Sequence, residues 1–252
     1  MKIVLRLFFG LVVIPGSIAA LLFHLNRHGF FDLDRIDIVL VEAPANSLHL
    51  KPLVAQLDQA LEAYRGQSLW SLKLEEISGK IGRLNWAEEH SVARSWPSTL
   101  TIKIRPYEVK AIFLESKDRF IPVIREGKLL DPVDPSLAPD VAVLEGAQFQ
   151  SHVDLRKKAV AFLDEVPKEG AFSRRTISEV HWDAKEGFLV KMMKSGIDVR
   201  IGEDHFGLKS IRAGQVLEYL ENRGVAAKSL DANLSKKVLV KLKEPSQSGL
   251  IE

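Results

Sequence analysis

The sequence predicts an α+β protein in three main parts: an N-terminal transmembrane helix, a small domain of β-α-α-β-β order, and a larger sheet-rich α+β domain. Three observations lead to this prediction. An uncharged apolar run lies near the N-terminus, two alternating apolar runs flank a turn in the first half, and short strand-like runs alternate with two helical patterns in the second. The expected parts are a cytoplasmic N-terminus, the helix, a linker, the two domains and a disordered tail, at residues 1–6, 7–25, 26–35, 36–106, 107–244 and 245–252.

The N-terminal run predicts a membrane anchor. Lys2 and Arg6 precede an uncharged stretch over residues 7–25. At roughly 1.5 Å per residue, this stretch is just long enough for a bilayer core of about 30 Å. The basic residues lie on its short side, so we expect the rest of the chain to be exported. The alternative is a signal peptide cleaved near Ala19, but the apolar run continues past that position to Phe23, which favours the anchor.

The most specific pattern of the first domain is a β-hairpin within residues 84–105. Apolar residues alternate with polar ones on both sides of Trp96-Pro97-Ser98-Thr99, which we expect to form the turn. We expect Trp86 and Val92 in the core, and Lys103 and Arg105 on the solvent face. We expect Glu88 and Glu89 on the surface. An alternating run over 36–41 predicts a preceding strand, and apolar residues at helical spacing predict two helices, near 53–64 and 75–84.

The second half of the chain predicts a sheet with helices packed on it. Ile177 to Ile201 holds three strand-like runs that we expect to pair antiparallel. The expected strands are 109–114, 120–124, 141–146, 177–182, 187–192, 197–201, 227–231 and 237–243, and the expected helices are 154–166 and 206–222. Asp204 is expected to cap the second helix, which explains the Glu203-Asp204-His205 cluster without a metal ion.

Composition and motifs favour binding over catalysis. The chain has 252 residues, 46% of them hydrophobic, a net charge of +2 and no cysteine, which excludes disulfides and thiol nucleophiles. The net charge gives no reason to expect a nucleic-acid partner. The sequence carries none of the common catalytic, nucleotide-binding or metal-binding motifs, so we expect no catalytic residues, no cofactor and no metal.

The hairpin resembles the closing hairpin of the POTRA domain in the bacterial division protein family FtsQ, also called DivIB. The resemblance lies in Val92-x-Arg94-x-Trp96-Pro97 and Leu100-x-Ile102-x-Ile104, with Leu84-Asn85-Trp86 upstream. Asn85, His90 and Arg105 depart from the family pattern. The resemblance implies a non-enzymatic, single-pass inner-membrane scaffold with a periplasmic bulk, acting at the division septum. It also implies that the exported domains recruit and link division proteins, and that the transmembrane helix and POTRA domain contact further division proteins. Two alternatives stay open: a POTRA-bearing component of outer-membrane transport or insertion, and a secreted enzyme.

The last strands carry the candidate partner-binding site. Leu230-Asp231-Ala232-Asn233 resembles a family segment beside which an FtsB-like partner, acting together with an FtsL-like protein, binds by strand addition. A final strand is expected to be an edge with unpaired backbone groups, with Val238, Val240 and Leu242 packing inward and lysines outward. Five lysines between 228 and 243 favour an acidic partner, although edge lysines also prevent unwanted pairing. The candidate residues are Asn233, Leu234, Ser235, Lys237, Val238, Leu239, Val240, Lys241 and Leu242.

Overall fold

A computed structural model describes residues 9–43 and 47–243. The chain divides into two compact units at Tyr107–Glu108, except that residues 47–49 group with the second unit. The first helical segments are η1, a π-helical turn over Phe9–Val13, and the α-helix α2 over Ile14–Arg27. The 14 residues of α2, at about 1.5 Å each, give a helix shorter than a bilayer core. Over the described ranges, no helix combines the length and the apolar character needed to cross a membrane. The structure therefore does not confirm the span predicted for residues 7–25, of which residues 7 and 8 lie outside the described ranges.

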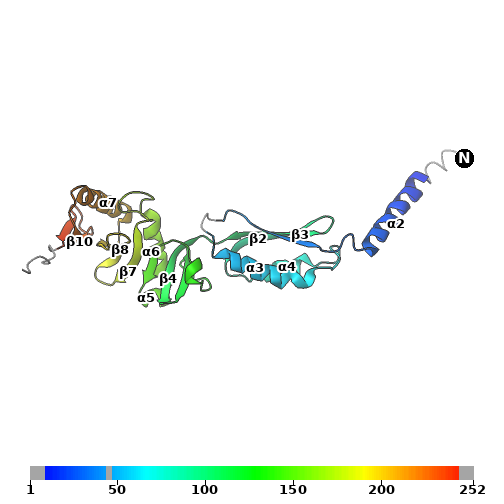
Figure 1. The fold of residues 1–252 in the computed structure, drawn as a ribbon, viewed down its shortest axis with the longest axis horizontal. Helices are drawn as coiled ribbons and strands as arrows, with labels where there is room; N and C mark the ends of the chain where they lie inside the picture. The colour runs from blue at the N-terminus through cyan, green and yellow to red at the C-terminus, as the bar shows by residue number, and fades with distance from the viewer. Residues whose placement is uncertain (1–8, 44–46, 244–252) are drawn as a thin grey trace, which may run out of the picture. The chain divides into compact units, whose positions relative to one another are not determined.

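The first unit has the predicted β-α-α-β-β order. Its three strands form a sheet in the order β1-β3-β2, in which β1 runs parallel to β3 and β2 antiparallel to it. Figure 1 shows α3 and α4 lying along one side of the β2–β3 hairpin. The bounds are β1 Arg35–Leu40, α3 Leu50–Leu61, the 3₁₀ turn η2 Glu62–Tyr64, α4 Leu74–Ile81, β2 Ala87–Ser95 and β3 Thr99–Pro106.

The core of this unit confirms most of the predicted hairpin. Trp86 is buried, as are alternate residues of β3 from Leu100 to Ile104, whereas Val92 is only half-buried against them. Glu88 and Glu89 are exposed, as predicted. Lys103 and Arg105 lie on the solvent face, as predicted. The Arg105 guanidinium is partly covered there by three carboxylates, those of Glu42, Glu88 and Glu89.

The second unit is an eight-stranded mixed sheet in the order β11-β10-β9-β8-β7-β6-β4-β5, so the α+β class is confirmed. The predicted antiparallel run β7-β8-β9 is confirmed as well. The sequence prediction missed two short helical segments, η3 and α5. The bounds are β4 Val109–Ser116, β5 Arg119–Ile124, η3 Pro135–Leu137, β6 Val143–Glu145, α5 Gln148–Ser151, α6 Val153–Glu165, β7 Ile177–Asp183, β8 Gly187–Met192, β9 Asp198–Gly202, α7 Phe206–Asn222, β10 Ala227–Asp231 and β11 Leu239–Leu242.

The two long helices of this unit pack on the sheet and place its last strands. Buried residues of α6 and α7, among them Phe162 and Ala213, join those of the central strands in one apolar core. Because β9 and β10 are parallel, the chain must cross over between them, and α7 provides that crossover. The position of β10, and of β11 beside it, therefore depends on how α7 is seated.

Candidate partner-binding edge

The strand β11 is an edge of the large sheet, as predicted. It pairs antiparallel with β10, and within residues 9–43 and 47–243 no strand pairs with its other side. The Lys243 N–H donates to the Ala226 carbonyl over 2.9 Å, so this amide faces inward. Amide groups alternate in direction along a strand. The N–H groups of Val240 and Leu242 therefore face away from the sheet, where an added strand would meet them.

The side chains of β11 only partly follow the predicted alternation. Val238 and Val240 are half-buried against the core, while Leu239 is 52% exposed. Leu242 was predicted to pack inward and is instead 53% exposed, so that prediction is wrong. Leu242 is the last residue of β11, and the register with β10 shifts beside it, between Ala227 and Ser229, so the end of this edge strand has little of the sheet to pack against.

A shallow pocket lies on the sheet beside this edge. It has a volume of about 310 Å³, and its apolar lining includes Leu189, Leu230 and Val240. Arg200 lies at its polar side, where it forms ion pairs with Glu186 at 2.8 Å and with Asp231 at 3.2 Å. The pocket can receive a side chain from an extended segment that pairs with β11.

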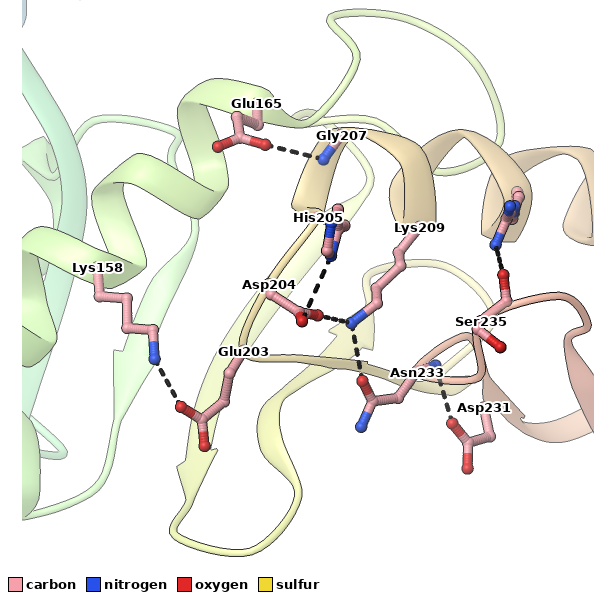
Figure 2. A network of polar contacts seen from close by, with 11 residues as sticks. Lys158, Glu165, Glu203, Asp204, His205, Gly207, Lys209, Asp231, Asn233 and Ser235 are labelled. Carbon is pink, nitrogen blue, oxygen red and sulfur yellow. Dashed lines mark hydrogen bonds and ion pairs between the residues drawn. The ribbon is translucent and has the colours of Figure 1, made fainter.

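Two cations of α7 hold the segment that leads into β11. The ammonium of Lys209, a residue only 5% exposed, donates to the Asn233 amide oxygen over 2.8 Å and also to the Asp204 carboxylate (Figure 2). The Arg212 guanidinium donates to the Ser235 carbonyl over 2.6 Å. The hydrogen bond from Lys209 lowers the pKa of Asp204, and the neighbouring imidazole of His205 adds to this effect. The approach to the edge is thus tied to the crossover helix.

Asp204 does not cap α7, so the capping prediction is wrong. The residue at the cap position is His205, in left-handed conformation with φ 48°, and the Gly207 N–H donates to Glu165 of α6 over 3.0 Å (Figure 2). Glu203 pairs instead with Lys158 at 2.7 Å. Of the three neighbouring side chains that sequence grouped together, Glu203 therefore turns to α6, while Asp204 and His205 contact each other at 3.3 Å.

Gly202, at the end of β9, permits the close approach of Asn233. Its φ is +84°, a region that favours glycine, and a Cβ built there would overlap the Asn233 side-chain amide. The Asn233 N–H in turn donates to Asp231 over 3.0 Å, which closes the turn after β10 (Figure 2). The position of this turn therefore requires a glycine at 202.

The structure separates the predicted site residues into two groups. Asn233 and Ser235 lie in the turn region held by α7, and Leu234 between them is half-buried. The others lie on or just before the edge strand: Lys237, Val238, Leu239, Val240, Lys241 and Leu242. Sequence reasoning missed Lys209 and Arg212 as supports of this site. A signal existed, because Lys209 falls at helical spacing between Phe206 and Ala213, on the face that is buried.

The opposite edge of the same sheet, β5, is covered by its own chain. Leu130 and Val133 donate their N–H groups to the carbonyls of Pro122 and Phe120, each over 2.9 Å. Ile124 donates to the Lys128 carbonyl over 3.1 Å. The covering segment 128–133 thus occupies the outer side of β5.

A further cluster of charged groups lies on the sheet away from the edge. Glu145, Glu179 and His181 bring ligand-type atoms within 4.8 Å of one another. The Lys191 ammonium already lies 3.0 Å from Glu179. Burial works against ionisation of Glu179, but hydrogen bonds from Lys191 and His181 outweigh it and lower the pKa of Glu179. The arrangement is an ion-pair cluster in which a lysine supplies the positive charge.

The fold and the open edge define a class of protein: a POTRA-type β-α-α-β-β unit followed by a sheet-rich unit with an unpaired final strand among its described residues. Comparison with known families agrees with this class. The family model "POTRA domain, FtsQ-type" matches residues 54–107, and "Cell division protein FtsQ/DivIB, C-terminal" matches residues 112–237. The chain therefore belongs to the FtsQ/DivIB family of cell division proteins.

Individual relatives are similar over most of the chain. A protein named cell division protein FtsQ from Geobacter sp. (strain M21) is 26% identical over 184 residues, which cover 70% of this chain and 66% of the relative. The FtsQ proteins of Geotalea daltonii and Rickettsia prowazekii are 24% and 27% identical, over 84% and 78% of this chain and 76% and 68% of their own lengths. The chain thus spans about two thirds of the Geobacter protein.

Proposed function

We propose that this protein is a non-enzymatic scaffold of the bacterial division complex, attached to the inner membrane at the septum and linking division proteins through its two units. Membership of the FtsQ/DivIB family supports a role in division. The apolar N-terminal run supports a single-pass anchor with a cytoplasmic N-terminus and an exported bulk. The sequence lacks common catalytic motifs, which supports a binding role.

The observation that carries the proposed binding mode is the open edge β11. An extended segment of an FtsB-like partner, acting together with an FtsL-like protein, adds as a further strand beside Val240 and Leu242. The backbone of this strand meets the outward N–H groups, and one of its side chains enters the pocket beside Arg200. Exposed Lys237 and Lys241 favour an acidic segment, because opposite charges speed encounter and select the partner.

The test removes one outward N–H group of β11 and keeps a side chain at the same position. Val240→Pro deletes the donor, and Val240→Ala is the matched control, because it shortens the same side chain and keeps the N–H. We expect Val240→Pro to weaken binding of a peptide from the partner's exported segment by about tenfold or more, since a lost bond also leaves the peptide acceptor unpaired. We expect Val240→Ala to retain most of the binding.

Titration calorimetry measures the binding, and urea unfolding of each variant checks that the second unit stays folded. Equal affinity of the wild type and Val240→Pro would show that the partner does not pair with this edge. Loss of binding in Val240→Ala alone would place the contact on the side chain rather than on the backbone.

A further inference from the structure

Three exposed aromatic side chains gather on the first unit. Phe30, Trp70 and Trp96 are 50%, 59% and 47% exposed, although they come from three separate segments of the chain. All three contact the buried ring of Phe31: the rings of Trp70 and Trp96 each lie 5.9 Å from it, and that of Phe30 lies 5.1 Å from it. The rings of Trp70 and Trp96 lie 4.3 Å apart. We call the three exposed residues the aromatic patch.

Hydrogen bonds within the first unit hold the aromatic patch in place. The Arg94 guanidinium donates to the carbonyls of Leu69 and Leu72, over 2.7 and 2.6 Å, and so holds the loop that carries Trp70. Both leucines are buried, while Trp70 between them points outward. The ordered loop therefore holds a large apolar ring at the protein surface. Exposed apolar surface of this kind indicates contact with a partner.

The patch adjoins the end of α2. Phe30 follows Arg27, the last residue of α2, by three positions, and its N–H donates to the Leu25 carbonyl over 3.1 Å. The Ser68 hydroxyl, two positions before Trp70, donates to the Asn26 side chain over 3.3 Å. The helix itself buries none of its side chains, and its exposed apolar residues include Ile14, Ile18, Leu21 and Phe23.

The helix α2 belongs to the apolar run that we propose as the membrane anchor, and its exposed apolar side chains favour an apolar surrounding. The aromatic patch continues that apolar surface beyond the polar turn at His24, Arg27 and His28. Tryptophan combines an apolar ring with one N–H donor, and it concentrates at the level of lipid headgroups, where both parts are satisfied.

We propose that the aromatic patch inserts into the headgroup region of the bilayer and fixes the first unit against the membrane surface. The inference rests on the proposed membrane attachment and adds to it a contact of the folded unit with lipid. We take the occupant to be lipid rather than a second protein, because the patch directly follows the end of α2, which the proposed attachment places in the bilayer.

The experiment uses the fluorescence of the full chain in vesicles of phosphatidylethanolamine and phosphatidylglycerol whose acyl chains are brominated. The chain has four tryptophans, of which Trp86 is buried and Trp182 lies in the second unit. Bromine quenches tryptophan at short range, so we expect clear quenching in the wild type. The double variant Trp70→Phe/Trp96→Phe keeps aromatic rings but loses the reporters, and we expect it to lose most of the quenching. The matched control Trp182→Phe should keep it.

The outcomes separate this inference from the proposed function. A chain that does not float with the vesicles would overturn the attachment and the patch contact together. A chain that floats, but in which aqueous iodide rather than brominated lipid quenches Trp70 and Trp96, would overturn the patch contact alone. Shielding of both residues from lipid and from iodide would mean that protein covers the patch, and it would likewise overturn the lipid contact.

Discussion

The large sheet ends in two edge strands that the chain treats differently. On the outer side of β5, the N–H groups of Leu130 and Val133 donate to carbonyls of that strand. Pro122 of β5 has no N–H group that would need a partner. On the outer side of β11, the N–H groups of Val240 and Leu242 meet no other strand in the described part of the chain. An unpaired edge attracts other strands, and proteins normally cover it. Within the described residues the chain covers one edge and leaves the other unpaired, which supports the proposal that β11 pairs with a partner strand.

The largest effect should come from opening the covered edge. Leu130→Ala empties a buried site in the covering segment, and we expect it to lower the free energy of unfolding by about 2 kcal/mol. The same change at the open edge, Leu239→Ala, should cost no more than about 0.5 kcal/mol, because Leu239 is 52% exposed. Urea unfolding measures both. Equal costs would mean that the segment 128–133 does not hold β5 as described.

The next largest effect concerns the turn after β10, which leads into β11. Gly202→Ala places a Cβ against Asn233 and strains a backbone with φ +84°, so we expect a loss of about 1–2 kcal/mol and weaker partner binding. Gly196→Ala is the matched control, because its φ is +63° and a Cβ there meets nothing within 4 Å. Both variants carry backbone strain, and only the first displaces Asn233. Equal partner binding by the two would show that the turn does not position the edge.

A smaller effect is expected from Lys209→Met, which keeps an apolar stem but removes the bonds to Asp204 and Asn233. We expect a loss of about 1 kcal/mol near pH 7, since both partners are exposed enough for water to replace the lysine. The pKa of Asp204 is lowered in the folded state. Its contribution is therefore complete above the pKa of an unfolded aspartate, about 3.9, and is lost as pH falls through the folded pKa.

The pH dependence of stability distinguishes the Lys209–Asp204 pair from the other carboxylates of the protein. Urea midpoints of the wild type and of Lys209→Met should differ most near neutral pH and converge in acid, where Asp204 is protonated. The double variant Lys209→Met/Asp204→Asn should be no less stable than the single lysine change. A constant difference across the acid range would assign the stabilising role of Lys209 to Asn233 alone.

The smallest effect on stability should accompany charge reversal at the open edge. Lys237→Glu/Lys241→Glu changes exposed side chains, so we expect the free energy of unfolding to change by no more than about 0.5 kcal/mol. Binding of the acidic partner peptide should nevertheless weaken, and the loss should shrink at high salt as charges are screened. Calorimetry at two salt concentrations measures this. Unchanged affinity at low salt would argue that the lysines serve only to keep other strands away.

The sequence predicted those features that depend on local periodicity. The hairpin of β2 and β3 follows from alternating apolar residues, and the bounds of α7 follow from helical spacing, ended by Arg223-Gly224. The open edge followed from the position of the strand in the chain. For the hairpin and for α7, neighbouring residues carry the information.

Features that depend on distant segments were missed or mistaken. The Gly207 N–H at the start of α7 donates to Glu165, 42 positions earlier in the chain, whereas the sequence pointed to the neighbouring Asp204. The exposure of Leu242 lies at the end of β11, where the register with β10, a different strand, shifts. The cover of β5 required knowing that the proline-rich segment after Gly127 returns along the strand. Local patterns contain none of these pairings.

The bulge in β10 has a consequence for stoichiometry. It lies opposite Lys241 and Leu242, and a bulge increases local twist, so β11 offers only a short and twisted length of backbone. Two copies that met edge to edge would also bring the lysines of both strands together. The edge should therefore accept one oppositely charged segment and resist stacking into fibres, and a sedimentation experiment on the complex should give one partner segment per chain.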